Sequence, residues 1–345
     1  MKILMVGHYP PHGGGVANHL DSVVRQLRKR HEVHVLTYGP IKVREFEREF
    51  VHQVNVLPVF GLRGTGFAFT ASRKIAELQR EHGFDVIHAH FVGTTSYSTV
   101  LAKKSIGAPV VVTAHGSDLE FTSRLPLGQF FVKKSLTEAD AVVAVSHYLA
   151  VKALSLGAPE VKVIPNGVEK AEARKVRREF IAFVGALRKY KGLDDFLKLA
   201  EHFPEEKFIV LGDGPLRALE KRAPPNVDFL GYRKDVEDFL SRSKLLVVPS
   251  RREGFGLVVL EANAVGTPVV ARRIGALPEL VREGKNGLLF RDVRELVRAV
   301  ECYLTNPARR VRAGSIGRIL SKHYSWERSV LELENLYDSL ISERD

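Results

Sequence analysis

Short β-branched or apolar runs alternate with stretches of helical apolar spacing along nearly the whole chain. This alternation predicts parallel sheets covered by helices, because two parallel strands need a crossover connection between them. In the first half the predicted strands are residues 2–8, 32–37, 54–57, 86–90, 110–115, 141–145 and 161–164. In the second half they are residues 180–185, 207–212, 227–230, 244–249 and 268–271. The predicted fold class is α/β, with two doubly wound, Rossmann-like domains.

The domain boundaries follow from where this alternation stops. A chain of 345 residues exceeds the usual size of one hydrophobic core, so two domains are expected. Residues 166–179 are polar, highly charged and without apolar periodicity, which predicts a linker between domains 1–165 and 180–324. Residues 325–345 predict a C-terminal helix with one apolar face that needs a surface to cover it. Two sheet edges facing each other would enclose a cleft between the domains.

Composition limits the cellular setting and the chemistry. The single Cys302 excludes an internal disulfide and a Cys-only zinc site, as expected in a reducing compartment. No apolar stretch is long enough to span a membrane and no cleavage site follows the N-terminal run, so we predict a cytoplasmic protein, with peripheral membrane contact left open. One Cys, 2 Met, 4 Gln and 8 Asn beside 92 charged side chains suggest a thermophilic source.

A formal net charge of +12 predicts attraction to an anionic partner. Phospholipid headgroups, nucleic acid and a phosphorylated substrate all satisfy this condition. The basic residues are scattered and are not interleaved with aromatic residues, so a nucleic-acid platform is not predicted.

A run of glycines follows the first predicted strand and opens directly into a helix. Gly14 and Gly15 allow the backbone to approach an anion closely, and the helix N-terminus offers free N–H groups. The run has neither the spacing of a dinucleotide fingerprint nor that of a P-loop. A phosphate site and an ordinary tight turn both remain open from this run alone.

His115 ends the predicted strand at residues 110–115 and precedes Gly116 and Asp118. This position puts an imidazole at the carboxyl edge of the first sheet, where ligands of open α/β sheets bind. A histidine bonded to a neighbouring loop is the alternative. His88 and His90 lie on another strand and are interpreted as sheet-packing residues, because no third metal ligand stands near them in the sequence.

The most informative segment is residues 249–261, PSRREGFGLVVLE. A strand ends in a charged loop, and a Gly-Phe-Gly turn then brings backbone amides to a helix N-terminus. The carboxylates of Glu253 and Glu261 suit hydrogen bonds to sugar hydroxyls or an acid/base pair. In the loop at residues 185–192, Arg188 and Lys191 offer cations that can neutralise a diphosphate leaving group.

Taken in order, these segments resemble the retaining glycosyltransferases of family 4, which have the GT-B fold. The resemblance runs over essentially the whole chain. It rests on GGVANH at 14–19, TAHGSD at 113–118, VS at 145–146, PNGV at 165–168, VGALRKYKG at 184–192, GDGP at 212–215, residues 249–261, PVV at 268–270 and YSWE at 324–327.

The resemblance implies a donor site for a nucleotide sugar. Its predicted catalytic residues are His115 and Glu253 on the transferred sugar and the cations Arg188 and Lys191 on the diphosphate. Its predicted donor-binding residues fall into three groups. Gly14 and Gly15 approach the diphosphate, and Glu261 binds the ribose. The backbone along the sugar and the phosphate is that of Gly254, Phe255, Gly256 and Leu257. Acceptors in this family bind mainly to the N-terminal domain, which makes Tyr9, His19 and Asp118 acceptor-side candidates. The resemblance also implies that the last helix returns to the N-terminal domain.

Two sequence details bear on the leaving group. Many relatives carry Arg directly after the glycine where this chain has Gly185 and Ala186, so Arg188 is considered as its substitute. No two Asp residues stand two apart, so the D-x-D metal motif of the other large glycosyltransferase fold is absent. We therefore expect no metal requirement and no cofactor, with cations and helix N-termini stabilising the leaving diphosphate.

The predicted activity is transfer of a sugar from a nucleoside diphosphate to an acceptor hydroxyl, with retention implied by the resemblance. A lipid-linked or cell-envelope glycan at an anionic membrane surface fits the basic charge, and a soluble acceptor is the alternative. UDP, GDP and ADP remain open as the nucleotide. The rival functions are a GT-B nucleotide-sugar epimerase, a phosphorylase that would need pyridoxal phosphate, and a non-catalytic binding protein for nucleotide sugars or anionic surfaces.

Overall fold

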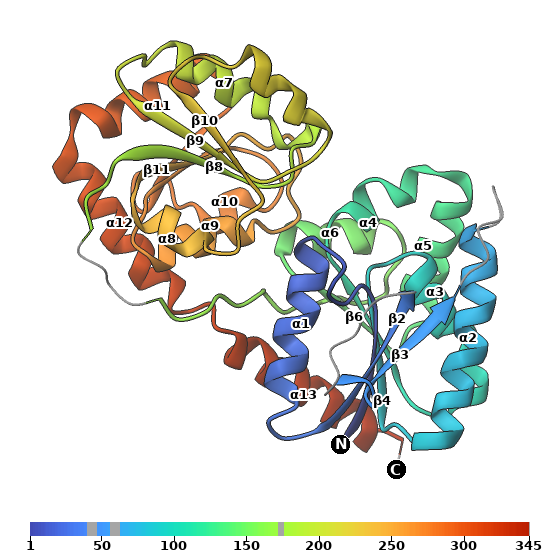
Figure 1. Cartoon of the computed structure of the whole chain (residues 1–345). Coiled ribbons are helices and arrows are strands. Elements are labelled where there is room, and N and C mark those ends of the chain that lie inside the picture. The colour runs from blue at the N-terminus through green and yellow to red at the C-terminus, as the bar shows by residue number, and fades with distance from the viewer. Residues whose placement is uncertain (40–46, 56–62, 172–175, 345) are drawn as a thin grey trace. The chain divides into compact units, whose positions relative to one another are not determined.

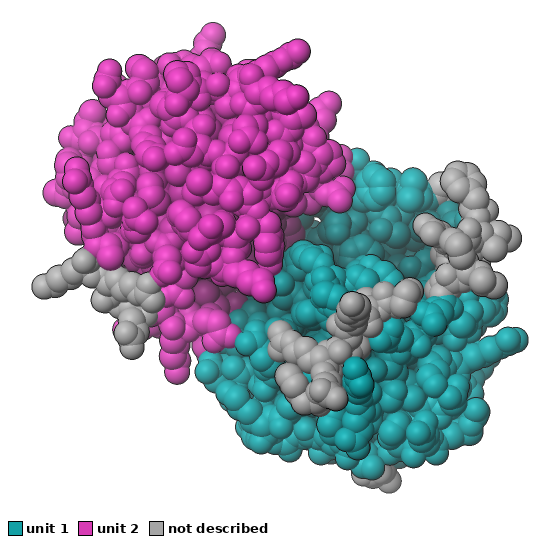
Figure 2. Space-filling view, in the orientation of Figure 1, with its two compact units in different colours: residues 1–166, 326–345 teal, residues 167–325 magenta. Residues whose placement is uncertain are grey.

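The computed structural model describes residues 1–39, 47–55, 63–171 and 176–344, which form two compact units. Unit 1 consists of Met1–Asn166 and Trp326–Asp345, and unit 2 consists of Gly167–Ser325 (Figure 2). The described part of the predicted linker, from residue 167 on, belongs to unit 2, and its residues 172–175 lie outside the described residues.

Unit 1 is built on a parallel sheet of seven strands in the order β3-β2-β1-β4-β5-β6-β7 (Figure 1). The strands are β1 Lys2–Val6, β2 Glu32–Gly39, β3 Val51–Asn55, β4 Val86–His90, β5 Val110–Ala114, β6 Ala141–Ala144 and β7 Lys162–Val163. Met5 lies in register with Val35 of β2 and His88 of β4. The central strands β4 and β5 are buried along their whole length, as expected for a parallel sheet covered on both faces.

Helices cover this sheet and include the end of the chain. They are α1 Gly15–Leu27, α2 Arg63–His82, α3 Thr94–Ile106, α4 Ser117–Glu120, α5 Pro126–Glu138, α6 His147–Ser155 and α13 Trp326–Ser342, with a short 3₁₀ turn, η2, at Thr122–Arg124. The C-terminal helix α13 is fixed by polar contacts as well as by its apolar face. Its Tyr337 hydroxyl lies 2.6 Å from Nδ1 of His88, and its Glu334 carboxylate bonds Arg30 and His31.

Unit 2 is built on a second parallel sheet, of six strands in the order β10-β9-β8-β11-β12-β13 (Figure 1). The strands are β8 Phe180–Val184, β9 Lys207–Leu211, β10 Val227–Gly231, β11 Ser243–Val248, β12 Val269–Arg272 and β13 Gly287–Phe290. The helices are α7 Leu193–Glu201, α8 Val236–Ser241, α9 Leu257–Ala264, α10 Leu277–Leu280, α11 Val293–Thr305 and α12 Pro307–Ser321, with 3₁₀ turns η3 Lys189–Lys191 and η4 Pro215–Arg222. Phe183, Phe196 and Phe208 pack together in its core.

The predicted α/β fold class is confirmed, with corrections at the edges of the sheets. Strand β3 begins at Val51, three residues before the predicted start, and the edge strand β13 was not predicted. Strand β13 has only four residues, begins with a glycine and is half-buried at Leu288 and Leu289, so its hydrophobic pattern is weak. In each sheet all strands are parallel, which brings the loops after the strands to one edge.

Candidate active site

The carboxyl edge of unit 2 holds a close pair of opposite charges. Nζ of Lys191, at the end of η3, donates to Oε2 of Glu253 at 2.7 Å. The two side chains are 21% and 14% exposed, so the pair is accessible but largely withdrawn from water. Burial opposes the charge of Lys191, but the attraction of Glu253 and its hydrogen bond outweigh burial and raise the pKa of Lys191. The ammonium is therefore charged at neutral pH.

A close backbone approach brings the Lys191 loop to the end of β11. Gly192 caps η3 with a φ of 74°, and a Cβ atom there would lie 2.2 Å from the carbonyl oxygen of Pro249. Both the positive φ and the lack of space require glycine at this position. The loop that carries Lys191 is thereby held against the loop that carries Glu253.

A second ionic network, which the sequence analysis did not single out, connects these two loops to α7 and β12. The carboxylate of Asp195, in the first turn of α7, accepts from Arg251 at 3.0 Å and from Arg272 at 2.6 Å. Arg251 also bonds Asp194 and the carbonyl of Lys189. The sequence signal for this network is a pair of arginines at the ends of adjacent strands and an acidic first helical turn.

Glu261 lies on α9, one turn after the helix begins. Helix α9 starts at Leu257 and is capped by Gly256, whose φ is 100°, and the first backbone N–H groups of a helix have no partner within it. Among the described residues the Glu261 carboxylate has no hydrogen-bonding or ionic partner, and burial raises its pKa from 4.5 to about 7. A half-buried carboxylate that has no partner among the described residues is suited to accept hydrogen bonds from ligand hydroxyls.

Arg188 precedes Lys191 by three residues but is not part of the ion pair. Its side chain is exposed, and it pairs with no side chain in the part of unit 2 that the structure describes. Ala186 is also exposed. The role of Arg188 on a diphosphate stays a prediction.

In unit 1 the glycine turn lies at the N-terminus of α1. Gly14 caps the helix with a φ of 114°, so its conformation requires glycine. Gly15 has no positive φ, and a Cβ atom there would meet no atom of the described residues within 4 Å. Neither backbone conformation nor packing among the described residues requires glycine at Gly15, and the predicted approach of a ligand to this turn stays a prediction.

His115 lies at the carboxyl edge of the unit 1 sheet within a cluster of imidazoles. Its Nε2 lies 3.3 Å from Nδ1 of His90, and its ring lies 4.6 Å from the ring of His19. Nδ1 of His19 lies 2.7 Å from Oδ1 of Asn166, which fixes that ring. Burial lowers the pKa of His19 to about 4 and holds the pKa values of His90 and His115 well below the ordinary value, so all three are neutral at pH 7.

The sequence analysis missed the part that His90 and Asn166 play in this cluster. Phe91, directly after His90, has a φ of 84°, a conformation that non-glycine residues seldom adopt and that is often retained near functional sites. His88 lies deeper, and its two nitrogens lie within hydrogen-bonding distance of the hydroxyls of Tyr337 and Thr113, which agrees with a packing role.

The three acceptor-side candidates are buried inside unit 1, and their role at an acceptor stays a prediction. Tyr9 is 1% exposed and its hydroxyl donates to Glu47 at 2.9 Å. His19 is 5% exposed and lies against His115. Asp118 is fully buried, and its carboxylate accepts four backbone N–H bonds, from Val92, His115, Gly116 and Leu119. Through these bonds Asp118 fixes the loop of His115.

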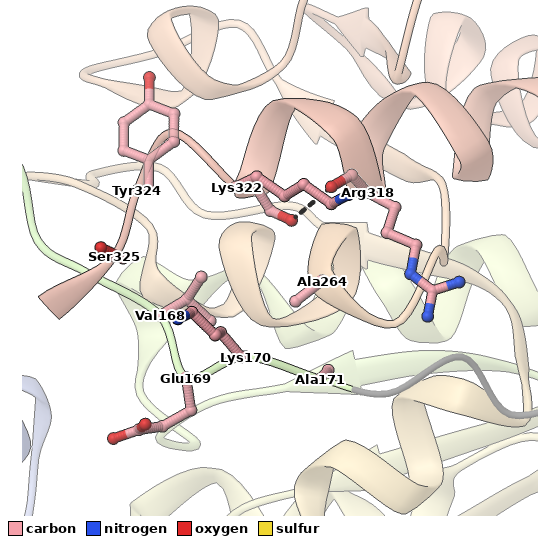
Figure 3. A pocket seen from close by; sticks show the side chains of 10 residues that line it. Val168, Glu169, Lys170, Ala171, Ala264, Arg318, Lys322, Tyr324 and Ser325 are labelled. Atoms are coloured by element: carbon pink, nitrogen blue, oxygen red, sulfur yellow. Dashed lines mark hydrogen bonds between the residues drawn. The ribbon is translucent and has the colours of Figure 1, made fainter. Parts of the chain in front are cut away.

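A pocket of about 370 Å³ lies elsewhere in unit 2, where the chain enters and leaves this unit (Figure 3). It is lined by residues 168–171, by Ala264 and by the segment from the end of α12 to Ser325, and Val168 and Ser325 form a parallel bridge beside it. None of the predicted site residues lines this pocket.

Two parallel α/β units, each with ligand-binding features at its carboxyl edge, define a GT-B type protein. Residues 168–319 match the family Glycosyl transferases group 1, and residues 13–172 match Glycosyltransferase Family 4. An uncharacterized glycosyltransferase of Methanocaldococcus jannaschii is 31% identical over 99% of both chains. The chain belongs to the group 1/family 4 glycosyltransferases and is a transferase enzyme.

Solved structures show the same fold. Sucrose-phosphate synthase of Thermosynechococcus elongatus superposes with a TM-score of 0.83 at 19% identity, over 99% of both chains. The Anabaena protein HepE, solved in complex with UDP, superposes with a TM-score of 0.80 at 19% identity, over 98% of this chain and 100% of that one. Within the described residues, no helix combines the length and the apolar character needed to cross a membrane.

Proposed function

We propose that this glycosyltransferase moves a sugar from a nucleoside diphosphate to an acceptor hydroxyl, with retention at the anomeric carbon and without a metal ion. The observation that carries the proposal is the ion pair of Lys191 and Glu253 beside the N-terminus of α9, whose Glu261 has no partner among the described residues. A cation, helix amides and an unpaired carboxylate match the diphosphate, sugar and ribose of one donor molecule.

Each group has a distinct part in this scheme. Lys191 neutralises the charge that grows on the diphosphate as the bond from the anomeric carbon to the β-phosphate oxygen breaks. Glu253, held by Lys191, accepts hydrogen bonds from the transferred sugar, and Glu261 accepts those of the ribose. His115, as a neutral imidazole, bonds a sugar hydroxyl. The acceptor oxygen bonds to the same face of the anomeric carbon, and its proton passes to the leaving phosphate, which is consistent with retention.

Positive charge from the protein takes the place of a divalent cation in this proposal. Lys191, Arg188 and the N-termini of α1 and α9 are the groups concerned. Turnover after exhaustive chelation should equal turnover with added Mg²⁺ or Mn²⁺. A strict dependence on either ion would contradict a metal-free mechanism.

Calorimetric titration without metal tests the donor site directly. We expect selective binding of one nucleoside diphosphate among UDP, GDP and ADP, weakened at least tenfold in Glu261→Ala. UDP is tested first, because HepE, which shares the fold, is solved with UDP. Equal binding of all three, or an affinity indifferent to Glu261, would overturn this assignment of the donor site.

We place a lipid-linked or cell-envelope acceptor on the side of unit 1, because apolar side chains are exposed after the His115 loop. Phe121, Leu125, Leu127 and Phe130 are 47% to 60% exposed, and the exposed Lys133 follows on α5. Apolar side chains beside basic ones suit the interface of an anionic membrane.

Vesicle sedimentation tests this membrane contact. We expect binding to vesicles containing phosphatidylglycerol at low salt, loss of part of it at high salt, and further loss in the double variant Phe121→Ser, Leu127→Ser. Val311→Ser with Ile319→Ser, which removes equally exposed apolar side chains from α12 in unit 2, is the matched control. Equal binding by both double variants, or no binding at low salt, would leave the soluble acceptor as the proposal.

A further inference from the structure

A second histidine cluster lies at the amino end of the unit 1 sheet, away from the glycine turn and His115. His34 lies near the start of β2, His52 near the start of β3, and His82 at the end of α2. One ligand nitrogen from each ring lies within 4.8 Å of the other two. In the proposed transfer these residues have no part, because the reacting groups lie at the carboxyl edge.

Two of the ring nitrogens in this cluster lie in close contact. Nδ1 of His34 lies 2.9 Å from Nε2 of His52. Nε2 of His82 is buried and has no hydrogen-bonding partner among the described residues; Oε1 of Glu81 lies 3.8 Å from it, and the ring of His82 lies 4.3 Å from the ring of His34. A buried imidazole nitrogen without a partner is costly, and a ligand that accepts its lone pair removes that cost.

The environment of His34 resembles the outer shell of a metal-binding histidine. Its Nε2 lies 3.2 Å from the carboxylate of Glu32, so that nitrogen carries the proton and Nδ1 presents its lone pair to the cluster. A carboxylate that holds a ligating histidine in this way fixes the tautomer and increases its basicity. Phe50 and Phe84 flank the His34 ring and limit the access of water.

A small divalent ion requires the rings of His34 and His52 to move. Zinc binds imidazole nitrogen at roughly 2.0–2.1 Å, which in a tetrahedral site separates two nitrogens by about 3.3 Å. The two rings now face each other with their nitrogens 2.9 Å apart and their centroids 5.2 Å apart, so both must rotate as well as separate by about 0.4 Å. The side chain of His82 is 22% exposed, although its Nε2 atom is buried.

The charges around the cluster are mixed. Glu32 and Glu77 favour a cation, whereas Lys74 and Arg28 oppose it. Lys74 is itself paired with Glu77, at 2.6 Å, which reduces its effect.

We propose that His34, His52 and His82 form a binding site for a divalent transition-metal ion such as Zn²⁺. A bound ion has a structural role at this site, because it links the edge strand β3 to β2 and to the C-terminal end of α2. It is separate from the glycosyl transfer, which we propose to be metal-free.

Zinc calorimetry on the chelator-treated full chain at pH 7.5 tests this site. We expect one zinc ion to bind per protein chain. The midpoint of thermal unfolding should rise by about 5 °C when Zn²⁺ is present well above its dissociation constant. Binding should be lost in His82→Gln and in His52→Gln. The second variant guards against a folding defect in the first, and circular dichroism checks both.

Two matched controls separate this cluster from other histidines. His115→Gln disables the cluster at the carboxyl edge, whose nitrogens also lie within 4.8 Å, and His202→Gln removes an exposed histidine of unit 2. Zinc binding that survives in both controls supports the proposal. Absorption of bound Co²⁺ should show tetrahedral d–d bands without a thiolate charge-transfer band.

Two results would overturn the proposal. One is no zinc binding by the folded wild type at micromolar concentrations. The other is zinc binding that is lost in His115→Gln and kept in His82→Gln, which would assign the ion to the other cluster. Neither result depends on turnover, so the proposed glycosyl transfer is tested separately.

Discussion

The carboxyl edges of the two units use different chemistry for what the resemblance implies is one reaction. In unit 2 the ion pair of Lys191 and Glu253 is supported by Asp195 with Arg251 and Arg272. In unit 1 the edge is formed by neutral imidazoles and by backbone amides at the start of α1. The difference teaches that strong charge is concentrated where the leaving diphosphate is expected, while the other side offers uncharged hydrogen-bonding groups.

The neutrality of the unit 1 histidines has a physical cause. Three imidazoles packed within one cluster cannot all be protonated, because burial and mutual repulsion both oppose the charge. In unit 2 Lys191 is paired with Glu253 and Arg272 with Asp195, whereas no opposite partner is found for Glu261 among the described residues. The two edges therefore respond differently to charge removal, to added bulk and to pH.

The largest expected effect comes from breaking the ion pair of unit 2. Lys191→Met should lower kcat by 100-fold or more, because it removes the cation that stabilises the leaving diphosphate and leaves Glu253 without its partner. Glu253→Gln should cause a loss of similar size. Steady-state kinetics with saturating donor measures both.

A control for these variants exists in the same unit. Lys244 and Glu206 form a pair of similar burial at the opposite edge of the sheet, and Glu206→Gln should leave kcat within about twofold of wild type. Comparable losses in Glu206→Gln and Glu253→Gln would mean that the ion pair is important only for stability.

The second prediction concerns the backbone amides at the start of α1, in unit 1. Gly15→Ala should raise KM for the donor more than tenfold without lowering the unfolding midpoint, because a methyl group there meets nothing in the described structure but blocks an approaching phosphate. Gly66→Ala in α2 is the matched change, also into open space, and should stabilise by about 0.5–1 kcal/mol without affecting KM. Equal KM values in the two variants would remove the anion site from α1.

The third prediction concerns pH. The pKa of Glu261 is about 7, so rising pH ionises its carboxylate, and affinity for a nucleotide sugar should increase about tenfold from pH 6 to pH 8. Glu261→Gln should abolish this dependence. His115→Gln should keep it, because the pKa of His115 lies well below this range. A pH dependence that disappears in His115→Gln instead would reverse the assignment.

The same ionisation has an opposite effect on folding. The pKa of Glu261 is raised from 4.5 to about 7 in the folded protein, so the folded state holds this proton more tightly than the unfolded chain. The free energy of unfolding contributed by this group therefore falls as pH rises from 4.5 through 7 and stays lower above. Chemical denaturation at pH 8 should find Glu261→Gln more stable than wild type, although it binds the donor less well.

Sequence patterns predicted the positions of the strands and of the motif residues better than they predicted the contacts and burial of those residues. The strand at Val86–His90 was predicted to the residue, and Lys191 was found as a cation after a strand end. Its partner Glu253 is 62 residues away, and such pairing depends on which strands lie side by side. The burial of Tyr9 and Asp118 also depends on packing, because a polar residue after a strand has the same sequence signal whether it points into solvent or into a loop.

The smallest expected effect concerns Arg188 and Ala186, where this sequence departs from the pattern that the resemblance implies. Arg188→Ala should lower kcat about threefold, because an exposed, unpaired guanidinium contributes less than the buried ammonium of Lys191. Ala186→Arg in that background restores a cation at the position where the resemblance implies an arginine. Ala186 is exposed, so the larger side chain has room. Recovery of kcat would show that the two positions supply the same charge, whereas an unchanged kcat in Arg188→Ala would leave Lys191 as the cation on which the leaving group depends.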